Sequence, residues 1–463
     1  MNQETICAVS TAPGTGGIAV IRISGPEAIT VCNGIFFPHK TTKNLLTQKA
    51  YTLCFGSIRR GDEVIDEVVV ALFRAPHSFT GEDTVEITCH GSTYIQQQIL
   101  QLLIEKGCRS ALPGEFTQRA FLNGKMDLSQ AEAVADLIAS TSAGMHKLAL
   151  NQMRGGFSNE LANLRARLLD FTSLVELELD FSEEEVEFAD RAHLKQLASE
   201  IEQLIRRLAD SFSMGNAIKN GIPVAIIGET NAGKSTLLNL LVGEERAIVS
   251  DIHGTTRDVI EDTFTLAGVT FRFIDTAGIR ETTDRIESLG IERTFQKLEQ
   301  ARIVLWVIDL TTPVDQIEGL ARQILPKTEG KKVLLVFNKS DLLSPQALSE
   351  KQQLFRHLPA SRIYISAKQH SNTDRLRELL TEAAALPSLS SSDVIVTNVR
   401  HYEALTQAHA AILRTLEGLD RQVSGDFLSQ DIRECIHYLG EITGQISNDE
   451  ILGNIFGRFC IGK

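Results

Sequence analysis

The sequence contains no apolar run that approaches the ~20 residues that a membrane-spanning helix needs. Its opening residues, Met-Asn-Gln-Glu, also lack the basic and apolar regions of an export signal. Both absences predict a protein that stays in the cytoplasm and does not enter a membrane.

Cysteine spacing and charge balance exclude further classes of protein. The seven cysteines are scattered, odd in number and never spaced as Cys-x-x-Cys, which argues against a disulfide framework or a zinc ribbon and favours reduced thiols. Lys and Arg number 46 against 59 Asp and Glu, so the net charge is −13, which argues against a general polyanion-binding surface. A nucleic-acid partner would need a local basic patch, and no Lys/Arg-rich run marks one.

The length of 463 residues predicts about three domains at a prior of ~150 residues each. Residues 1–121 mix β-rich runs with turn signals, which is typical of an α+β domain. Apolar residues then recur at intervals of three and four, which predicts a helical bundle that begins in 122–215. We expect strands over 18–23, 64–73 and 84–89, and helices over 94–106, 128–141, 161–179 and 194–212.

Residues 216–386 alternate strand and helix, which indicates a doubly wound α/β domain. A Ser-rich linker follows, and residues 387–463 return to helical periodicity over 400–419 and 427–443. The simplest arrangement inserts the α/β domain into the helical bundle. Its expected strands cover 224–227, 269–274, 303–308, 333–337 and 363–365.

Two acidic features stay open at this point. In the strand over 84–89, Glu86 lies on the face opposite Val85 and Ile87, so it points to solvent or into a cleft, and spacing alone favours solvent. The acidic run over 180–187 could bind a cation, but a turn that leads into a helix N-terminus explains it more simply.

The segment Gly228-Glu-Thr-Asn-Ala-Gly233-Lys234-Ser235 follows an apolar strand and opens onto an apolar helix. This is the setting of a phosphate-binding loop, because the free N–H groups and the positive dipole end of the helix face the loop. The two glycines let the backbone curl around phosphates, Lys234 reaches the β and γ groups, and the Ser235 hydroxyl can bind Mg²⁺.

Further motifs follow in the order that a Ras-like GTPase requires. Asp275-Thr-Ala-Gly278 comes at the end of one expected strand and Asn338-Lys339-Ser340-Asp341 at the end of another. The Asp341 carboxylate can accept from the guanine N1–H, which adenine lacks, so this element predicts GTP rather than ATP. Ser366-Ala367-Lys368 would support the base, and Thr256 in Gly254-Thr-Thr-Arg-Asp258 would bind Mg²⁺.

One residue departs from the Ras-like pattern. The position after Asp275-Thr-Ala-Gly278 holds a water-orienting glutamine in Ras-like enzymes, and here it is Ile279. An aliphatic side chain cannot orient water, so hydrolysis must use other groups. Arg280, Glu281, Asp284 and Glu287 lie nearby in the sequence.

The chain resembles, over nearly its whole length, the MnmE (TrmE) family of tRNA-modification GTPases within the TrmE-Era-EngA-like superfamily. The resemblance rests on Arg22-Ile-Ser-Gly-Pro26, Ser78-Phe-Thr-Gly-Glu-Asp83, Pro113-Gly-Glu-Phe-Thr-Gln-Arg-Ala-Phe-Leu-Asn123, the phosphate loop, Gly254-Thr-Thr-Arg-Asp258, Asp275-Thr-Ala-Gly278 and Cys460-Ile-Gly-Lys463. It implies an N-terminal folate-binding and dimerisation domain, a split helical domain and an inserted G domain. It also implies a homodimer that forms a heterotetramer with the FAD-dependent partner MnmG, and that adds a carboxymethylaminomethyl or aminomethyl-type group to C5 of the wobble uridine of certain tRNAs. The one-carbon unit would come from 5-formyl- or methylene-tetrahydrofolate.

The resemblance also implies how GTP is hydrolysed without the glutamine. A K⁺ ion bound between paired G domains would supply positive charge, held by Asn231, Ser250, Ile252 and Thr255. Glu287 would orient the nucleophile through a bridging water. Motifs and resemblance together predict GTP or GDP contacts at Asn231, Ala232, Gly233, Lys234, Ser235, Thr236, Ser250, Asp251, Ile252, His253, Gly254, Thr255, Thr256, Asp275, Thr276, Ala277, Gly278, Asn338, Lys339, Asp341, Ser366, Ala367 and Lys368.

For the folate, the resemblance points to Arg22, Glu86, Lys125 and Lys463, which makes Glu86 a ligand to the donor edge of a pterin ring. Cys460 belongs to the same terminal motif and becomes a catalytic candidate only through the resemblance, since a free thiol near a chain end is more often inert.

Two other functions stay open. A ribosome-assembly GTPase would usually carry a KH-like module with Gly-x-x-Gly in a basic setting, and none follows residue 393. A one-carbon transferase with a regulatory G domain would share the folate site, and analysis of the tRNA wobble uridine would distinguish it.

Overall fold

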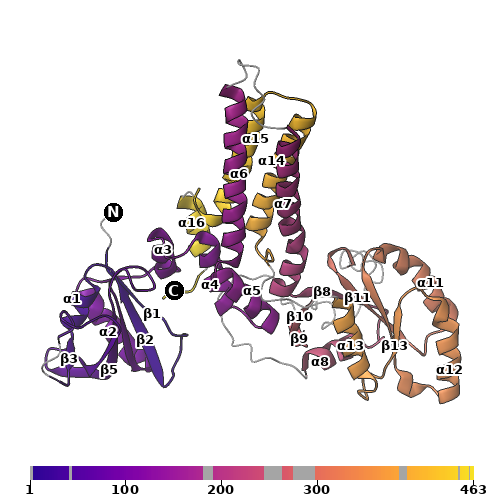
Figure 1. Cartoon of the computed structure of the whole chain (residues 1–463). Coiled ribbons are helices and arrows are strands. Elements are labelled where there is room, and N and C mark those ends of the chain that lie inside the picture. Colours follow the sequence, from indigo (N-terminus) through magenta and orange to yellow (C-terminus); the bar gives the residue numbers. More distant parts are fainter. Residues whose placement is uncertain are drawn as a thin grey trace. The chain divides into compact units, whose positions relative to one another are not determined.

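The computed structural model of the protein describes residues 4–40, 44–180, 191–243, 263–274, 298–384, 394–446, 449–457 and 459–462. The chain forms two compact units, which Figure 1 shows in sequence colours. One unit comprises Met1–Ile138, Gln152–Gln203 and Ala404–Lys463, and the other comprises Ala139–Asn151 and Leu204–Glu403.

The first unit contains a seven-stranded sheet in the order β3-β4-β5-β6-β2-β1-β7. Helices α1 and α2 pack on this sheet over a core that includes Ile21, Ile23, Val70, Val85 and Ile87. Strand neighbours are antiparallel except the pair β1 and β7. The elements are β1 (Ile6–Val9), β2 (Ile18–Ser24), α1 (Ala28–Asn33), β3 (Phe36–Pro38), β4 (Thr52–Arg60), β5 (Glu63–Phe73), β6 (Thr84–His90), α2 (Thr93–Glu105), β7 (Arg109–Ser110) and α3 (Glu115–Leu122).

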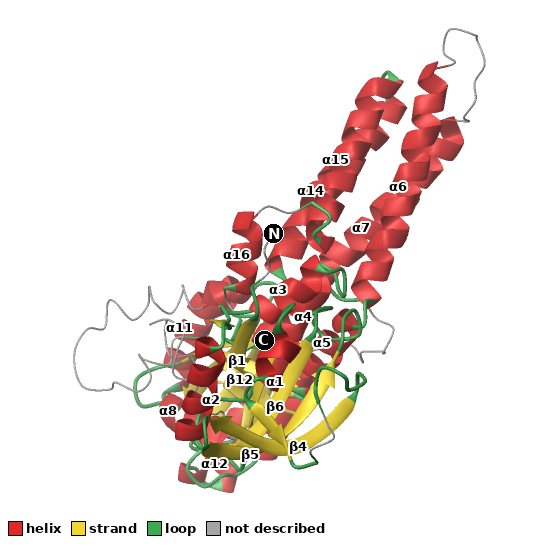
Figure 2. Ribbon diagram, turned by 90° about the vertical axis from the view of Figure 1, so that its left-hand side faces the viewer, coloured by secondary structure: helices red, strands yellow, loops and turns green. Residues whose placement is uncertain are grey.

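Long helices form the rest of this unit, and Figure 2 shows them in red. Helix α6 packs against α15, and α7 and α14 are joined by the ion pairs Lys195–Asp420 and His409–Glu202. Helices α7 and α14 also continue into the second unit. The bounds are α4 (Leu128–Ile138), α6 (Gly156–Asp180), α7 (Arg191–Asn220), α14 (Val399–Asp420), α15 (Gly425–Thr443) and α16 (Asp449–Phe456), and α5 (Ala143–Met153) belongs mostly to the second unit.

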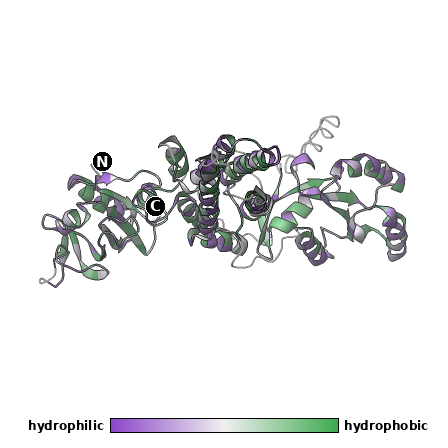
Figure 3. Ribbon diagram, turned by 45° about the horizontal axis from the view of Figure 1, so that its top comes forward, coloured by the Kyte–Doolittle hydropathy of each residue, from purple (hydrophilic) through white to green (hydrophobic). Residues whose placement is uncertain are grey.

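The second unit contains a six-stranded sheet in the order β13-β12-β11-β8-β10-β9. All pairs are parallel except β9 with β10. Helices α8 and α13 cover one face and α11 the other. Figure 3 shows apolar strands and mostly hydrophilic outer helix surfaces, as a parallel sheet buried on both faces requires.

The elements of this unit are β8 (Ile222–Ile227), α8 (Lys234–Gly243), β9 (Thr263–Leu266), β10 (Val269–Phe273), β11 (Ile303–Asp309), α11 (Val314–Ile324), η2 (Leu325–Thr328), β12 (Lys332–Asn338), η3 (Ser340–Leu342), α12 (Pro345–Leu354), η4 (Phe355–His357), β13 (Ser361–Tyr364) and α13 (Thr373–Ala384).

Sequence periodicity predicted both sheet classes correctly, an α+β N-terminal part and a doubly wound α/β part. The helix expected over 128–141 is too long, because α4 ends at Ile138. The acidic run lies outside the described residues apart from Asp180. Within the described ranges, every helix is too short or too polar to span a bilayer. The predicted domain boundaries stay predictions.

Candidate nucleotide site and N-terminal ion-pair site

The loop between β8 and α8 needs glycine at both of its ends. Gly228 has φ +147°, and a Cβ atom there would lie 2.2 Å from the carbonyl oxygen of Val307. Gly233 has φ +98°, and the loop residue Asn231 also has a positive φ of +64°. A side chain at Gly228 would meet backbone, and one at Gly233 would meet the Asn338 side chain, and both would strain a backbone at positive φ. The loop therefore has the tight curvature that a phosphate-binding loop requires.

Side chains that bind phosphates and cations lie at the start of α8. Lys234 is the first residue of this helix, and its Nζ donates to the carbonyl oxygens of Gly228 at 2.7 Å and Glu229 at 2.6 Å. Ser235 follows it and is half-buried, whereas Thr236 is exposed and Ala232 is buried. The ammonium group and the helix N-terminus thus face the same loop, where both would attract anions.

Asn338 joins the phosphate loop to the loop over 366–368. Its Nδ2 donates to the carbonyl oxygen of Ala232 at 2.9 Å, and its Oδ1 accepts from the Ala367 N–H at 3.0 Å. The Asn338 side chain is nearly fully buried. Three segments that the sequence assigned to one nucleotide therefore meet at the carboxyl edge of the parallel sheet, where ligands of such folds bind.

In the segment predicted to recognise guanine, Lys339 has φ +65° and leads into η3, which contains a half-buried Asp341. The Ser340 N–H donates to the carbonyl oxygen of Ile365 at 3.1 Å, which fixes η3 beside the last loop. In that loop Ser366 is buried and Lys368 is exposed.

Asp309 belongs to this site, and the sequence analysis missed it. Its Oδ2 lies 2.6 Å from Lys339 Nζ, and its Oδ1 accepts from the N–H and the hydroxyl of Thr311. Burial tends to raise the pKa of Asp309, but these hydrogen bonds outweigh it and hold the pKa below its ordinary value. Its position at the carboxyl end of β11, paired with Asn338, was the signal that could have revealed it.

Several predicted residues lie outside the described part of the chain. They are Ser250, Asp251, Ile252, His253, Gly254, Thr255, Thr256, Asp275, Thr276, Ala277, Gly278, Glu287 and Lys463. Of the predicted cation ligands, Asn231 and Ser235 lie within it.

Arg22 and Glu86 meet on neighbouring strands of the N-terminal sheet. They are direct register partners on β2 and β6, and Arg22 Nε and Nη2 lie 2.9 and 2.8 Å from Glu86 Oε1. Their side chains are 20% and 27% exposed. Spacing left Glu86 facing solvent or a cleft, and its carboxylate is half-buried and ion-paired, so it is neither fully solvated nor enclosed. Lys125 is exposed, and its Nζ donates to the Pro76 carbonyl oxygen at 2.9 Å.

The C-terminal residues contact the same part of the sheet. The Ser10 hydroxyl donates to the carbonyl oxygen of Gly462 at 3.0 Å, and the Gly114 N–H lies 3.4 Å from the Cys460 carbonyl oxygen. Ser10 follows β1, whose Ala8 is the register partner of Arg22. Cys460 is exposed. The terminal motif therefore lies within a few residues of the Arg22–Glu86 pair along the adjoining strand.

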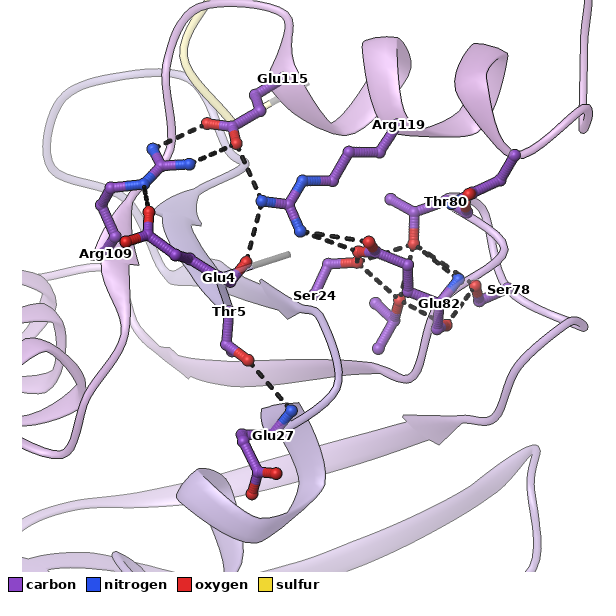
Figure 4. A network of polar contacts seen from close by, with 12 residues as sticks. Glu4, Thr5, Ser24, Glu27, Ser78, Thr80, Glu82, Arg109, Glu115 and Arg119 are labelled. Atoms are coloured by element: carbon purple, nitrogen blue, oxygen red, sulfur yellow. Dashed lines mark hydrogen bonds and ion pairs between the residues drawn. The ribbon is translucent and has the colours of Figure 1, made fainter. Parts of the chain in front are cut away.

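The motif segments over 78–83 and 113–123 form a buried polar network near Arg22 and Glu86 (Figure 4). Arg119 Nη1 lies 3.1 Å from Glu82 Oε2, and Arg119 Nη2 lies 2.9 Å from Glu115 Oε1. All three side chains are less than a tenth exposed. Burial tends to raise the pKa of Glu115, but hydrogen bonds from Arg109 and from the Leu112 N–H outweigh it and lower the pKa. Paired charges of this kind tolerate burial because each is hydrogen-bonded.

Comparisons with known proteins identify the family. A family model described as GTP-binding protein TrmE N-terminus matches residues 5–125, and one described as MnmE helical domain matches residues 128–460. Proteins named tRNA modification GTPase MnmE match over the full length of both chains. The one from Bacteroides fragilis is 66% identical over 466 residues and the one from Bacteroides thetaiotaomicron is 64% identical over 466 residues.

A solved structure of Aquifex aeolicus Era bound to GDP·AlF4⁻ is 28% identical over 41% of this chain and 66% of that chain, with a TM-score of 0.27. That score is too low to bear on the fold. The full-length identities, by contrast, establish the family: the chain belongs to the MnmE (TrmE) family of tRNA modification GTPases.

Proposed function

We propose that this protein hydrolyses GTP in a K⁺-dependent manner and, as a homodimer in complex with the FAD-dependent protein MnmG, modifies C5 of the wobble uridine of certain tRNAs. The added carboxymethylaminomethyl or aminomethyl-type group would take its one-carbon unit from a tetrahydrofolate derivative. Family membership supports the tRNA reaction, and the cytoplasmic location stays a prediction.

The observation that carries the GTPase part is the double hydrogen bond of Asn338. It ties the carbonyl oxygen of Ala232 in the phosphate loop to the N–H of Ala367 in the base-supporting loop. A ligand with phosphates at α8 and a base at Asp341 would therefore contact loops whose relative positions are fixed by the hydrogen bonds of Asn338. In this arrangement Lys234 and the helix N-terminus hold the phosphates, and the Asp341 carboxylate accepts from guanine.

The predicted cation ligands that the structure describes, Ser235 and Asn231, offer oxygen atoms, which suit hard metal ions. Ser235 offers a hydroxyl oxygen for Mg²⁺, and Asn231 offers an amide oxygen for K⁺. Asn231 is exposed and has a positive φ of 64°. Bound K⁺ would supply positive charge where Ile279 replaces the water-orienting glutamine, with Ser250, Ile252 and Thr255 as further ligands and Glu287 as the group that orients water.

The Arg22–Glu86 pair supports the folate part. A carboxylate beside a guanidinium presents one acceptor and one donor group, which matches a pterin ring that carries donors next to an acceptor. Lys125, Lys463 and Cys460 complete the proposed site on the strength of the family resemblance.

GTP hydrolysis in KCl against NaCl, measured on the full chain, tests the proposal. We expect at least a tenfold faster rate in K⁺, and a much smaller ratio in Asn231→Ala. Asn239→Ala is the matched control, because Asn239 is exposed on α8 just beyond the loop. Equal parental rates in both salts would contradict the K⁺ dependence. Unmodified wobble uridine in a deletion strain, restored by this chain, tests the tRNA reaction separately.

A further inference from the structure

Two phenylalanine rings lie close to the guanidinium of Arg22. The Arg22 Cζ atom lies 5.4 Å from the centroid of the Phe79 ring and 5.6 Å from that of Phe116. Both distances are within the range of a cation–π interaction. The guanidinium is therefore held by the Glu86 carboxylate and by two aromatic rings.

Both rings belong to the segments that form the buried network in Figure 4. Phe79 lies between Ser78, whose hydroxyl donates to the Glu82 carbonyl oxygen at 2.6 Å, and the fully buried Thr80. The Thr80 hydroxyl lies 2.7 Å from that of Ser24, and the Ser24 hydroxyl donates to Glu82 Oε2 at 2.7 Å. The loop that carries Phe79 is thus fixed by side-chain bonds on both sides of the ring.

Phe116 is fixed by the opposite half of the network. Its neighbour Glu115 accepts from Arg109 at 2.6 Å and from Arg119 at 2.9 Å, and Arg119 also pairs with Glu82. Arg119 therefore joins helix α3, which carries Phe116, to the loop that carries Phe79. The buried guanidinium of Arg119 therefore links the two segments whose rings lie close to the guanidinium of Arg22.

The two rings differ in what else they do. Phe116 is fully buried and packs with Ile6, Ala8 and Ala111, so the core needs it in any case. Phe79 is 37% exposed. A half-exposed ring contributes less to the core, so its placement beside Arg22 calls for another reason.

Among the described residues, Arg22 bonds through Nε and Nη2 and Glu86 through Oε1. This leaves Arg22 Nη1 as a donor and Glu86 Oε2 as an acceptor for a ligand. We infer that Phe79 and Phe116 are positioning residues that aim these two groups at the acceptor and donor edge of a planar heterocycle. The inference rests on the proposed function, in which that heterocycle is a reduced pterin.

The test uses the full-length protein with Phe79→Leu, Phe79→Tyr and the matched control Phe37→Leu. Phe37 is also a half-exposed phenylalanine beneath an arginine, with Arg59 Cζ 5.2 Å from its centroid, and it lies on β3 at the far edge of the same sheet. The first readout is the hydrogen exchange rate of the Arg22 Nε–H by NMR, assigned with Arg22→Lys. The second is the Kd for 5-formyltetrahydrofolate by calorimetry.

We expect Phe79→Leu to speed exchange of the Arg22 Nε–H and to weaken folate binding about fivefold, since a partly exposed cation–π contact has roughly that effect on affinity. Phe79→Tyr should restore both, and Phe37→Leu should change neither. A purely structural role would lower the melting temperature and leave Arg22 exchange unchanged.

Unchanged Arg22 exchange in Phe79→Leu would overturn the inference. If the parent protein does not bind the folate but exchange at Arg22 still responds to Phe79→Leu, the proposed ligand is wrong and the positioning role stands.

Discussion

The side-chain Nδ2 of Asn338 lies 2.2 Å from the point that a Cβ atom on Gly233 would occupy. The two residues are 105 positions apart in the sequence, and they belong to different motifs. Since the same Nδ2 donates to the Ala232 carbonyl oxygen, the missing side chain of Gly233 is what lets the two loops meet. The segments predicted to bind phosphate and guanine therefore depend on each other.

Gly233→Ala should abolish nucleotide binding for this reason. The added methyl group would displace Asn338, break the bond to Ala232 and strain a backbone at φ +98°. We expect the Kd for GDP to rise at least 100-fold in a fluorescent-nucleotide titration. Gly243→Ala is the control, because a Cβ atom there meets nothing within 4 Å. GDP binding by Gly233→Ala at parental affinity would contradict this account of the loop.

Asp341→Asn should change base preference from guanine to xanthine. The carboxylate accepts hydrogen bonds from the guanine N1–H and amino group, whereas an amide can donate to the 2-oxo group of xanthine. A competition titration of GTP against XTP measures the change, and we expect GTP affinity to fall at least tenfold. Asp315→Asn, an exposed change on α11, should leave the preference as in the parent. Unaltered GTP affinity in Asp341→Asn would remove the residue from base recognition.

The ion pair between Asp309 and Lys339 stabilises the six-stranded sheet. Its loss should make this sheet less stable at low pH. The pKa of Asp309 is held below its ordinary value of 3.8, so the stabilisation is complete above that value and is lost as the pH falls through the lower folded-state pKa. The single tryptophan, Trp306, is buried in the same strand and reports unfolding of this sheet alone.

Urea unfolding followed by Trp306 fluorescence measures this effect in Asp309→Asn. The variant should unfold at lower urea than the parent at pH 6, and the difference should narrow at pH 3, because Asp309 in the unfolded parent chain takes up a proton below its ordinary pKa of 3.8. A difference that stays constant or widens as the pH falls would show that the carboxylate charge is not the cause. Asp315→Asn should track the parent at both pH values.

Motif spacing predicted that the segments of Ala232, Asn338 and Ala367 come together, because Asn338 and Ala367 follow strand ends, where the fold itself brings such residues to one edge of the sheet. Sequence patterns did not predict which side of β4 is buried. Cys54 and Gly56 are buried, whereas the side chains of Leu53 and Phe55 point outward and are 66% and 49% exposed. The strand therefore shows the reverse of the usual alternation, with its larger apolar side chains on the exposed face.

The buried network was also beyond sequence reasoning. Glu82 and Arg119 are 37 residues apart, and no periodicity links a loop carboxylate to a particular arginine on a later helix. The motifs that contain them supported the family resemblance without showing that their charged residues bond to one another. In the folded protein, Arg119 on α3 pairs with Glu82 in the loop and with Glu115 on its own helix. These contacts explain why the two motifs carry acidic residues and arginine.

Gly462→Ala should release the C-terminal residues from the N-terminal sheet. Gly462 has φ +94°, and a Cβ atom there would lie 2.1 Å from the carbonyl oxygen of Val9, so alanine cannot keep the contact in which Ser10 donates to residue 462. We expect carboxypeptidase to remove the terminal residues several times faster than in the parent, and folate binding to weaken if the terminal motif completes that site. Gly453→Ala on α16 is the control, since a Cβ atom there meets nothing within 4 Å. Equal rates of release in Gly462→Ala and the parent would show that the tail is not held at this position.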